Sequence, residues 1–324
     1  MNNSTVIDEI DIDPAERVTA LDLYRRWELQ QWQAQSLEYE RDGDGWLGLP
    51  AFARLPLLAT LARFLVGETT VTETLAPLAY AAPDVDYKMY LATQLADEAR
   101  HTVFFRHYLA FLSETLGNEE LSQVSGVDKV GDLFENALLD AVERVRADPY
   151  DTAAWYEGVV VYHLLVEGAV AMTGLHTLLG TVRALSGFDI LRTGITNVAR
   201  DESRHISFGV LALRNGVRDG HRGHIVDMIR KHIPAAARTL VDPETRDPFP
   251  RLVPVLRKRA ELLDEQWEFA ASSLTRRMSS IGISEDIIAD LSENWRQACS
   301  AAAAEYGRIH GEPHPITYLD RADE

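Results

Sequence analysis

The chain has 324 residues, of which 46% are hydrophobic, and it carries a formal net charge of −18. Its apolar content allows a sizeable core, whereas its negative charge argues against binding to nucleic acid or to an anionic membrane surface. Cys299 is the only cysteine, which excludes a disulfide framework and a thiolate cluster. No secretory signal is evident at the N-terminus, and no run approaches the roughly 18 apolar residues of a membrane span. We therefore expect no membrane span and, by default, a cytoplasmic location.

Apolar residues recur at helical spacing along most of the chain, and Gly- and Pro-rich turns separate the periodic stretches. The expected helices span residues 17–38, 52–82, 86–114, 129–146, 152–179, 187–218, 221–240, 254–279 and 284–307. We expect Pro234 to interrupt the seventh helix, and residues 39–50 and 115–130 to form loops. No stretch shows the alternation of a strand.

These elements predict an all-α fold with a four-helix bundle core and additional N- and C-terminal helices. We expect a single domain over residues 1–324. Its core helices would lie at about 52–218, its accessory helices at about 221–307, and a polar tail at 308–324.

The pentapeptide Asp-Glu-x-Arg-His occurs twice, at residues 97–101 and 201–205. Residues three apart share one face of a helix, so each copy presents a glutamate and a histidine together. Upstream of each copy, a single glutamate interrupts an apolar helical stretch: Glu68 precedes the first copy and Glu167 the second. The repeat predicts two helix pairs related by approximate two-fold symmetry.

Two single glutamates and two Glu-x-x-His pairs form the ligand set of dinuclear iron and manganese sites in helical bundles. Carboxylates and imidazoles suit either metal. Four buried carboxylates without metal would each cost several kcal/mol, which is comparable with the roughly 5–15 kcal/mol stability of a whole domain. The predicted metal ligands are Glu68, Glu98, His101, Glu167, Glu202 and His205.

The aspartate that opens each pentapeptide points about 100° away from the glutamate that follows it. A metal-bound histidine donates its other N–H to a carboxylate or a carbonyl. We therefore expect each aspartate to contact the histidine of the opposite copy, and the two arginines to close the network with charge-assisted hydrogen bonds. The expected network joins Asp201 to His101 and Asp97 to His205, together with Arg100 and Arg204.

Other histidines fit a metal site less well. His163 lies four residues before Glu167 on roughly the same stripe, so it is either a further ligand or, as we favour, a buried and hydrogen-bonded side chain. His221 and His224 have no carboxylate at metal spacing, and we expect them to form a surface pair.

With these residues in place, the chain resembles the small subunit of class I ribonucleotide reductase. It resembles more closely that subunit's relatives, the ligand-binding oxidases with a heterodinuclear manganese–iron centre. The resemblance runs from about Trp32 to the helices after residue 254. Its strongest stretches are residues 67–72, 89–102, 162–168, 173–174 and 201–205. The resemblance implies a ferritin-like bundle in which manganese is held by Glu68, Glu98 and His101, and iron by Glu167, Glu202 and His205; a di-iron pair is the alternative.

The resemblance further implies an O2-dependent oxidoreductase that binds a long-chain fatty acid or a similar apolar molecule. It implies an ether crosslink from the Tyr162 oxygen to the β-carbon of Val71. Val71 shares the face of Glu68, but spacing alone does not select Tyr162, which is otherwise a core tyrosine. An electron donor of unknown identity and a homodimer complete the expectation. The apolar channel would be lined by residues that ordinary core packing explains equally well, namely Phe64, Val71, Leu95, Val166, Ala169, Val170 and Leu175.

Two positions separate the related subfamilies. Phe105, four residues after the first repeated histidine, cannot store a phenoxyl radical, which disfavours a tyrosyl-radical reductase subunit. Leu175 departs from the aromatic residue expected in some relatives. Two alternatives stay open. One is a manganese–iron reductase small subunit, which needs a large-subunit partner. The other is a non-catalytic lipid- or metal-binding protein that uses the same ligands.

Overall fold

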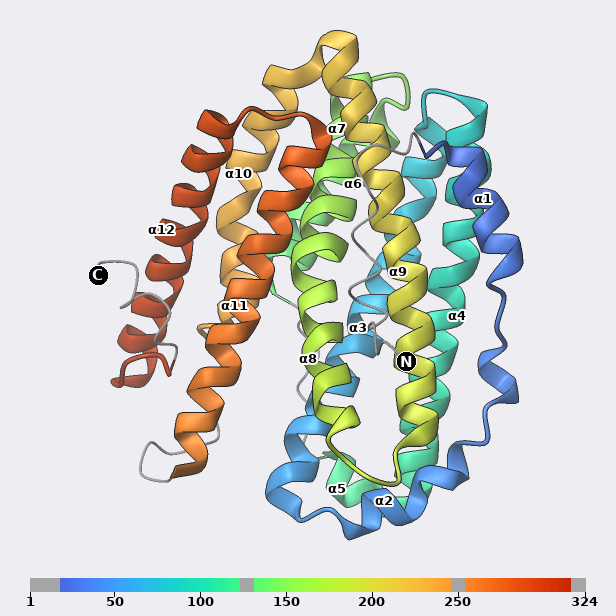
Figure 1. The fold of residues 1–324 in the computed structure, drawn as a ribbon, viewed down its shortest axis with the longest axis vertical. Helices are drawn as coiled ribbons and strands as arrows, with labels where there is room; N and C mark the ends of the chain where they lie inside the picture. The colour runs from blue at the N-terminus through green and yellow to red at the C-terminus, as the bar shows by residue number, and fades with distance from the viewer. Residues whose placement is uncertain (1–17, 123–130, 246–253, 316–324) are drawn as a thin grey trace, which may run out of the picture. The chain divides into compact units, whose positions relative to one another are not determined.

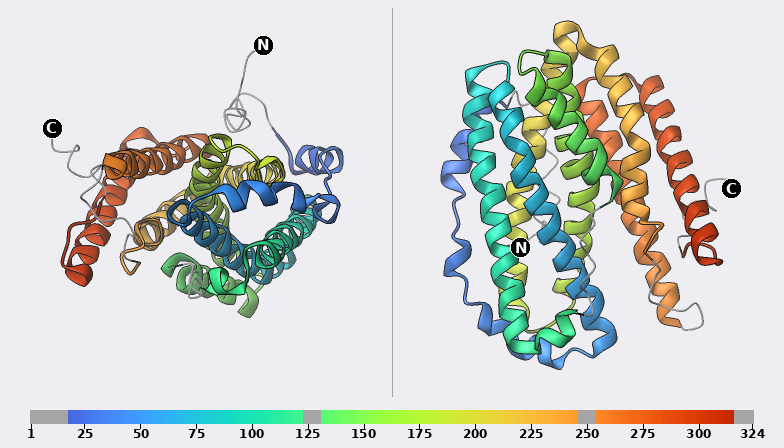
Figure 2. Two further views of the ribbon diagram at one scale, coloured as in Figure 1. Left: turned by 90° about the horizontal axis from the view of Figure 1, so that it is seen from below. Right: turned by 180° about the vertical axis from the view of Figure 1, so that it is seen from behind.

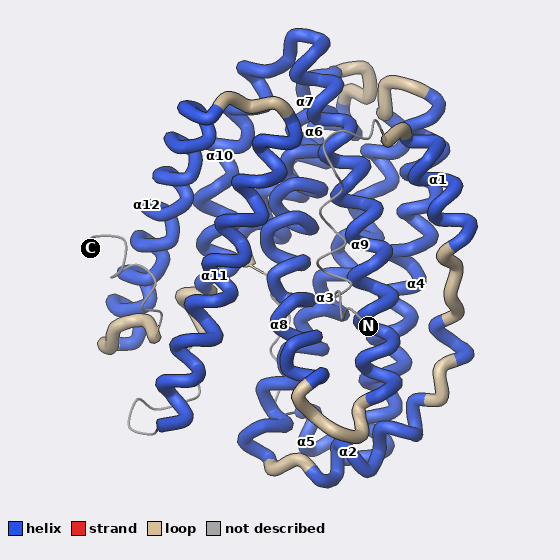
Figure 3. The backbone as a smooth tube through the Cα atoms, in the orientation of Figure 1, coloured by secondary structure: helices blue, strands red, loops and turns tan. Residues whose placement is uncertain are grey.

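The computed structural model describes residues 18–122, 131–245 and 254–315. Figure 1 shows the helices that these residues form, and Figure 3 shows that helices and connecting loops account for all of them, with no strand. The all-α prediction is therefore confirmed for the described part of the chain.

The chain divides into two compact units, each built from three separate segments. The first unit comprises residues 1–130, 142–155 and 175–208, and the second comprises residues 131–141, 156–174 and 209–324. The single domain over the whole chain stays a prediction.

In the first unit, α3 (Ala51–Ala81) and α4 (Val85–Leu116) pack side by side, as Figures 1 and 2 show. Asp84 defines the start of α4, since its side chain accepts a hydrogen bond from the backbone N–H of Tyr87 at 2.8 Å. α1 (Ala20–Leu29) also lies against α4 and begins with a capping box between Thr19 and Asp22. Short elements follow α1 and α4: η2 (Ala34–Ser36), η3 (Tyr39–Asp42), α2 (Gly43–Gly48) and α5 (Asn118–Ser122).

A buried carboxylate fixes the start of α9 (Asp189–Gly216), the helix that carries the second pentapeptide. Asp42 accepts hydrogen bonds from the backbone N–H groups of Ile190 and Leu191, at 3.0 and 2.8 Å. It also accepts a hydrogen bond from the Tyr108 hydroxyl at 2.8 Å. Asp42 thus serves as an N-terminal cap supplied from a distant part of the sequence, and it ties α9 to α4 through Tyr108.

In the second unit, α10 (Arg222–Val241) and α11 (Pro254–Ile281) each pack against α12 (Glu285–His310), as Figure 2 also shows. Both α10 and α11 also pack against η5 (Val160–Ala171). The Arg238 guanidinium of α10 holds both carboxylate oxygens of Glu305 on α12, at 3.1 and 3.0 Å. Two further π-helical segments are η4 (Leu133–Leu138), which leads into α6 (Leu139–Ala147), and η6 (Val217–His221).

The helix expected over residues 152–179 changes its geometry along its length. It begins as α7 (Thr152–Val159), continues as the π-helix η5 and ends as α8 (Met172–Arg183). Periodicity did not predict the π-helical part, because an almost unbroken apolar run does not distinguish α-helical from π-helical spacing. Among the described helices, the stretch Thr152–Arg183 is the one long and apolar enough to cross a membrane by length and composition. However, 83% of its apolar window is buried, which is typical of a core helix.

Three local expectations were wrong. The helix over 17–38 ends at Leu29, where the chain turns so that Trp32 can reach a buried aspartate. Residues 39–50 are largely helical, because their glycines serve close packing: a Cβ at Gly45 would lie 2.3 Å from the Gly187 carbonyl oxygen. Pro234 lies inside α10 without ending it, since that helix buries Ile229, Ile233 and Ala237, and packing offsets the lost hydrogen bond.

The expected loop over 115–130 contains α5, and its remainder lies outside the described residues. The tail predicted from residue 308 begins later, because α12 extends to His310. Residues 316–324 are likewise outside the described residues.

Candidate metal centre

The two pentapeptides lie in the middle of α4 and α9, with their glutamates and histidines pointing into the first unit. Glu98 and Glu202 are 1% and 3% exposed, and both His101 and His205 are 0% exposed. Glu68 of α3 is also buried. The first unit therefore brings together five of the six predicted ligands, which come from three helices.

The carboxylates converge on one nitrogen of each imidazole. His101 Nδ1 lies 3.3 Å from Glu202 Oε1, 3.4 Å from Glu68 Oε2 and 3.7 Å from Glu98 Oε2. His205 Nδ1 lies 3.3 Å from Glu98 Oε1 and 3.4 Å from Glu202 Oε2. The ligand atoms of Glu68, Glu98, His101 and Glu202 all lie within 4.8 Å of one another, so this group can hold a metal ion.

The other nitrogen of each imidazole contacts the aspartate of the opposite pentapeptide. His101 Nε2 lies 3.2 Å from Asp201 Oδ2, and His205 Nε2 lies 3.2 Å from Asp97 Oδ2. A carboxylate only accepts hydrogen bonds, so each Nε2 carries a proton and donates it. The aspartates thus leave each Nδ1 to face the glutamates, which is the tautomer that a metal ligand needs.

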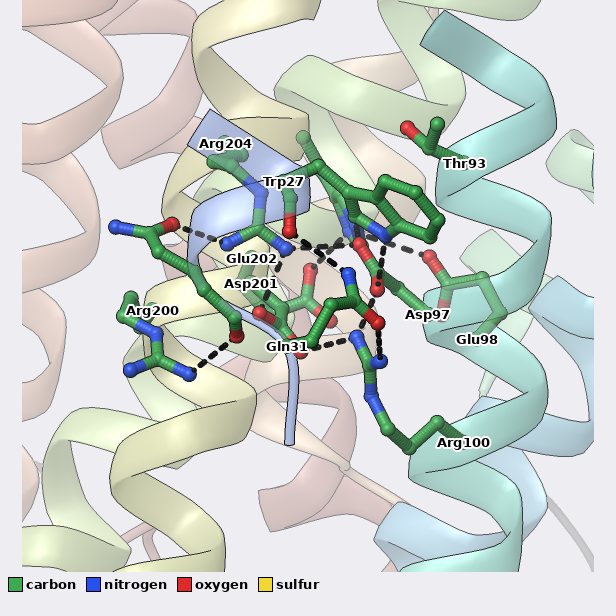
Figure 4. Close-up of polar contacts among 12 residues, drawn as sticks. Trp27, Gln31, Thr93, Asp97, Glu98, Arg100, Arg200, Asp201, Glu202 and Arg204 are labelled. Carbon is green, nitrogen blue, oxygen red and sulfur yellow. Dashed lines mark hydrogen bonds and ion pairs between the residues drawn. The ribbon is translucent and has the colours of Figure 1, made fainter. Parts of the chain in front are cut away.

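Each aspartate is bound by both arginines of the repeat, as Figure 4 shows. Arg204 Nη2 donates to Asp97 Oδ2 at 2.9 Å and to Asp201 Oδ1 at 2.6 Å. Arg100 Nη2 donates to Asp201 Oδ2 at 3.1 Å and also to Asp97 Oδ1. Two buried negative charges are therefore matched by two guanidinium groups.

Sequence reasoning missed the side chains that cover this network. Trp27 Nε1 donates to Asp97 Oδ1 at 2.9 Å, and Trp32 Nε1 donates to Asp201 Oδ2 at 2.7 Å. Gln30 Oε1 accepts from Arg204 at 2.5 Å, and Gln31 Oε1 accepts from Arg100 at 3.0 Å. In the sequence, these residues are marked only by two tryptophans five residues apart before the first motif. Such a pair is equally expected from ordinary core packing.

The buried oxygen and nitrogen atoms of this group are chemically suited to bind a metal ion. Glu68 Oε2, His101 Nδ1 and Glu202 Oε2 are buried and make no hydrogen bond within the described part of the chain. Since His101 Nε2 holds the ring proton of the neutral imidazole, Nδ1 would turn a lone pair toward carboxylate oxygens. Only positive charge between these atoms, from a cation or from added protons, makes this arrangement stable.

Protons are the alternative to metal, and the surroundings of each group determine where they would bind. Burial raises the pKa of Glu68 to about 8, with His101 opposing this shift. Burial lowers the pKa of His101, but the surrounding carboxylates, Glu68 first, outweigh it and raise that pKa well above 6.5. Burial likewise raises the pKa of Glu202, but the charges of His205 and His101 beside it bring that pKa down to about 2. At neutral pH the metal-free cluster therefore holds extra protons on Glu68 and His101.

Three further residues named from the sequence belong to the second unit. Glu167, Tyr162 and His163 all lie in η5 and are 3%, 0% and 1% exposed. The burial expected of His163 is confirmed, and its ring lies 4.8 Å from that of Tyr162. Val71 is buried on α3. The role of Glu167 as a ligand and the pairing of Tyr162 with Val71 stay predictions.

The other residues named in the sequence analysis have surroundings that do not indicate a special role. Phe105 is fully buried and stacks on Phe64, with ring centroids 5.3 Å apart. His221 and His224 are partly exposed, and the His221 ring lies against Tyr156 at 4.8 Å. All seven proposed channel residues are buried or half-buried, which core packing explains as well as a channel does.

Glu-x-x-His motifs on two long helices, together with buried glutamates, are the arrangement from which dinuclear carboxylate sites are built in helical bundles. No family model matches the chain. Solved structures of an R2-like ligand-binding oxidase share its fold. A variant with anaerobically reconstituted Mn/Fe cofactor superposes with a TM-score of 0.66 at 21% identity, over 87% of this chain and 100% of that chain. An aerobically reconstituted variant gives 0.66 at 21% identity, over 88% and 100%.

A third variant, in which a tyrosine is replaced by phenylalanine, gives a TM-score of 0.54 at 19% identity, over 98% of this chain and 100% of that chain. At these identities the similarity establishes the fold. The prediction of a ferritin-like helical bundle is therefore confirmed.

Proposed function

We propose that this protein is an O2-dependent oxidase with a dinuclear manganese–iron centre. The observation that carries the proposal is His101, whose Nε2 is held by Asp201 while its Nδ1 faces three glutamate oxygens. The shared fold with an oxidase that is described with a Mn/Fe cofactor supports the same conclusion. The first metal would be held by Glu68, Glu98 and His101, and the second by Glu167, Glu202 and His205.

The ligand set accepts either metal, because carboxylate and imidazole bind manganese and iron alike. We favour the mixed pair because the structures with this fold are described with Mn/Fe. A di-iron centre is the alternative, and metal analysis of protein loaded in the presence of both ions distinguishes the two.

When bound, a reduced manganese–iron pair supplies the electrons that activate O2 for the oxidation of an unactivated C–H bond. The chain's own contribution is to hold the ligands and exclude water. Asp97 and Asp201 fix the tautomer of each histidine, and the two arginines hold the aspartates. The burial of every ligand keeps water from competing for the oxidising equivalents.

We propose that an early product of this chemistry is an ether bond between the Tyr162 oxygen and the Val71 β-carbon. The O–H bond of the tyrosine and the β-C–H bond of the valine break, and one C–O bond forms. Two protons and two electrons leave the chain, and O2 is the oxidant that accepts them. Both side chains are buried, as such a crosslink requires.

The proposal includes an apolar ligand, for which a long-chain fatty acid is the leading candidate. It is supported by the ligand-binding description of the structures with this fold and by the burial of Val71 and Leu175. We further propose a homodimer in the cytoplasm that receives electrons from a separate donor. An acidic surface without nucleic-acid partners is consistent with the net charge of −18.

The decisive experiment is intact mass spectrometry of protein loaded with manganese and iron and then exposed to O2. We expect a loss of two hydrogen atoms, mapped to a linked pair of peptides that contain residues 71 and 162. Tyr162→Phe and Val71→Ala variants should bind metal but show no mass loss. Fully loaded wild-type protein that keeps its mass would contradict the crosslink and favour a non-catalytic lipid- or metal-binding protein.

One observation favours a manganese–iron reductase small subunit as the second candidate. The half-buried Trp32 donates a hydrogen bond to Asp201, which contacts His101, so an unbroken chain leads from a partly exposed aromatic ring toward a predicted ligand. Ribonucleotide reduction by the metal-loaded protein mixed with a reductase large subunit, without crosslink formation, would favour this candidate.

A further inference from the structure

A buried arginine of the second unit contacts the backbone next to Glu167. Arg277 of α11 is 8% exposed, and its Nη1 donates a hydrogen bond to the Gly168 carbonyl oxygen at 2.5 Å. Figure 1 shows α11 beside the green helix that contains η5, and the two elements are in contact. A guanidinium group is thus directed at the peptide that immediately follows a predicted metal ligand.

The backbone at this point departs from regular helical bonding. In η5, the Met172 N–H reaches five residues back to the Glu167 carbonyl oxygen. The next two carbonyl groups both accept hydrogen bonds from side chains: Gly168 from Arg277, and Ala169 from the Thr173 hydroxyl, each at 2.5 Å. Side chains therefore anchor the backbone on the C-terminal side of Glu167, where π-helical bonding gives way to α-helical bonding.

Glycine at position 168 makes this contact possible. A Cβ at this position would lie 2.9 Å from the His163 carbonyl oxygen and 3.4 Å from Arg277 Cδ. The first distance is closer than a Cβ can approach a backbone atom, so any larger residue would have to displace the helix or the arginine. Gly168 and Arg277 therefore act together on the same peptide.

A π-helical segment aims its side chains differently from the α-helix to which it can relax. Relaxation by one residue would turn a side chain by roughly 100° about the helix axis. Glu167 lies inside this segment, so the direction of its carboxylate depends on whether the π-helical bonding persists. A charge-assisted hydrogen bond to Gly168 stabilises the π form at this residue.

We propose that Arg277 is a positioning residue for Glu167, which it holds in the orientation needed to bind the second metal by fixing the Gly168 carbonyl group. The inference rests on the proposed function, because it takes Glu167 to be a ligand. It adds a residue that lies in a different helix from every predicted ligand.

The test compares metal binding by wild-type protein with that of Arg277→Met, Arg277→Lys and, as a matched control, Arg230→Met. Arg230 lies in the same unit and pairs at the surface with Asp290. Anaerobic titration with manganese and iron should give two metals per wild-type and Arg230→Met chain. Arg277→Met should keep one metal and lose affinity for the other by roughly 10–100-fold. Arg277→Lys should recover part of this loss, because an ammonium group can still donate to the carbonyl oxygen.

A second pair of variants leaves the arginine in place. Gly168→Ala should reproduce the loss of one metal, whereas Gly223→Ala should not, because a Cβ at position 223 meets nothing within 4 Å. Electron paramagnetic resonance of the loaded variants reports the coupling between the two ions, and a positioning role predicts that this signal is lost or altered. A general loss of packing would instead lower both affinities together.

The outcomes separate the inference from the function on which it rests. Wild-type protein that binds fewer than two metals would overturn the proposed function. Wild-type protein with two metals, together with Arg277→Met and Gly168→Ala variants that bind both ions with unchanged affinity and spectrum, would overturn only the role of Arg277. If circular dichroism shows that Arg277→Met is unfolded, Arg277→Lys is tested by the same measurements. An Arg277→Lys variant with the metal affinity and spectrum of the wild type would then overturn the role of Arg277.

Discussion

Each of two aspartates accepts four hydrogen bonds in the first unit's polar cluster, and each directly precedes a predicted metal ligand. Asp201 accepts hydrogen bonds from Trp32, from both repeated arginines and from His101. Its pKa is lowered far below the usual value: burial alone would raise it, but the hydrogen bond and charge of His101, with Arg204 and Trp32, outweigh burial. A carboxylate held in this way stays ionised at neutral pH.

Replacement of Asp201 by alanine removes the acceptor that fixes the His101 tautomer. The imidazole can then place its proton on Nδ1 and turn the wrong nitrogen toward the glutamates. We expect metal affinity to fall by roughly 10–100-fold, measured by anaerobic titration of the purified variant. The control is Asp290→Ala, which removes an exposed carboxylate of the second unit. Equal affinity in Asp201→Ala and wild-type protein would show that Asp201 does not position His101.

The residues of the site could be predicted to different degrees from the sequence. A repeated pentapeptide specifies Glu98, His101, Glu202 and His205 together, because chance does not produce the same spacing twice. Trp27 could not be found in this way, since a hydrogen bond from an indole to a residue 70 positions away leaves no local pattern. Contacts that depend on tertiary structure are visible only after the helices are placed.

At the scale of single elements, α9 depends on a residue that precedes it by more than one hundred positions. Asp42 satisfies two N–H groups at the start of α9 and the Tyr108 hydroxyl, and all of these groups are buried. Tyr108 in turn accepts a hydrogen bond from Trp46 Nε1 at 2.9 Å. The orientation of the second pentapeptide therefore depends on a remote cap as well as on packing.

Asp42→Ala should destabilise the protein without removing a ligand. It leaves three buried donors without their acceptor, and the loss of a helix cap costs about 0.5–2 kcal/mol, with about 1–3 kcal/mol for a buried group left unpaired. We expect a lower midpoint of denaturant-induced unfolding. Asp44→Ala, two residues away and exposed, should unfold like wild type. A variant with Asp42→Ala that unfolds at the wild-type midpoint would show that the cap contributes nothing.

The positions of α3, α4, α9 and α12 could be predicted within a few residues from apolar periodicity and from the turn residues between the helices. The interior of η5 could not, since nearly every residue from Val160 to Ala169 is apolar and buried, and neither α- nor π-helical spacing stands out. Residues 39–50 were wrongly assigned to a loop for another reason. Glycine there permits close approach, as at Gly45, and composition alone cannot distinguish this use from a turn.

The shifted pKa values of the buried cluster make the stability of the whole protein depend on pH. Without metal, the folded protein retains protons that its unfolded chain releases. Glu68 has a folded pKa of about 8 against 4.5 in a model compound, and the pKa of His101 is raised well above 6.5. Asp201 and Glu202 have lowered pKa values, so the stability that they contribute is constant above about pH 5.

Metal-free protein should therefore lose stability as the pH rises from about 5 to 8. A group whose pKa is raised on folding stabilises the folded state only while the proton stays bound, and both Glu68 and His101 change in this direction. We expect the melting temperature of chelator-treated protein to fall by on the order of 5 °C or more across this range. Manganese and iron take the place of the protons, so the loaded protein should show a much smaller change. Because the Glu68→Gln variant has no carboxyl proton to lose there, its metal-free melting temperature should depend less on pH. If the melting temperatures of metal-free and loaded protein changed equally with pH, exchange of protons for metal in the cluster would not be linked to folding.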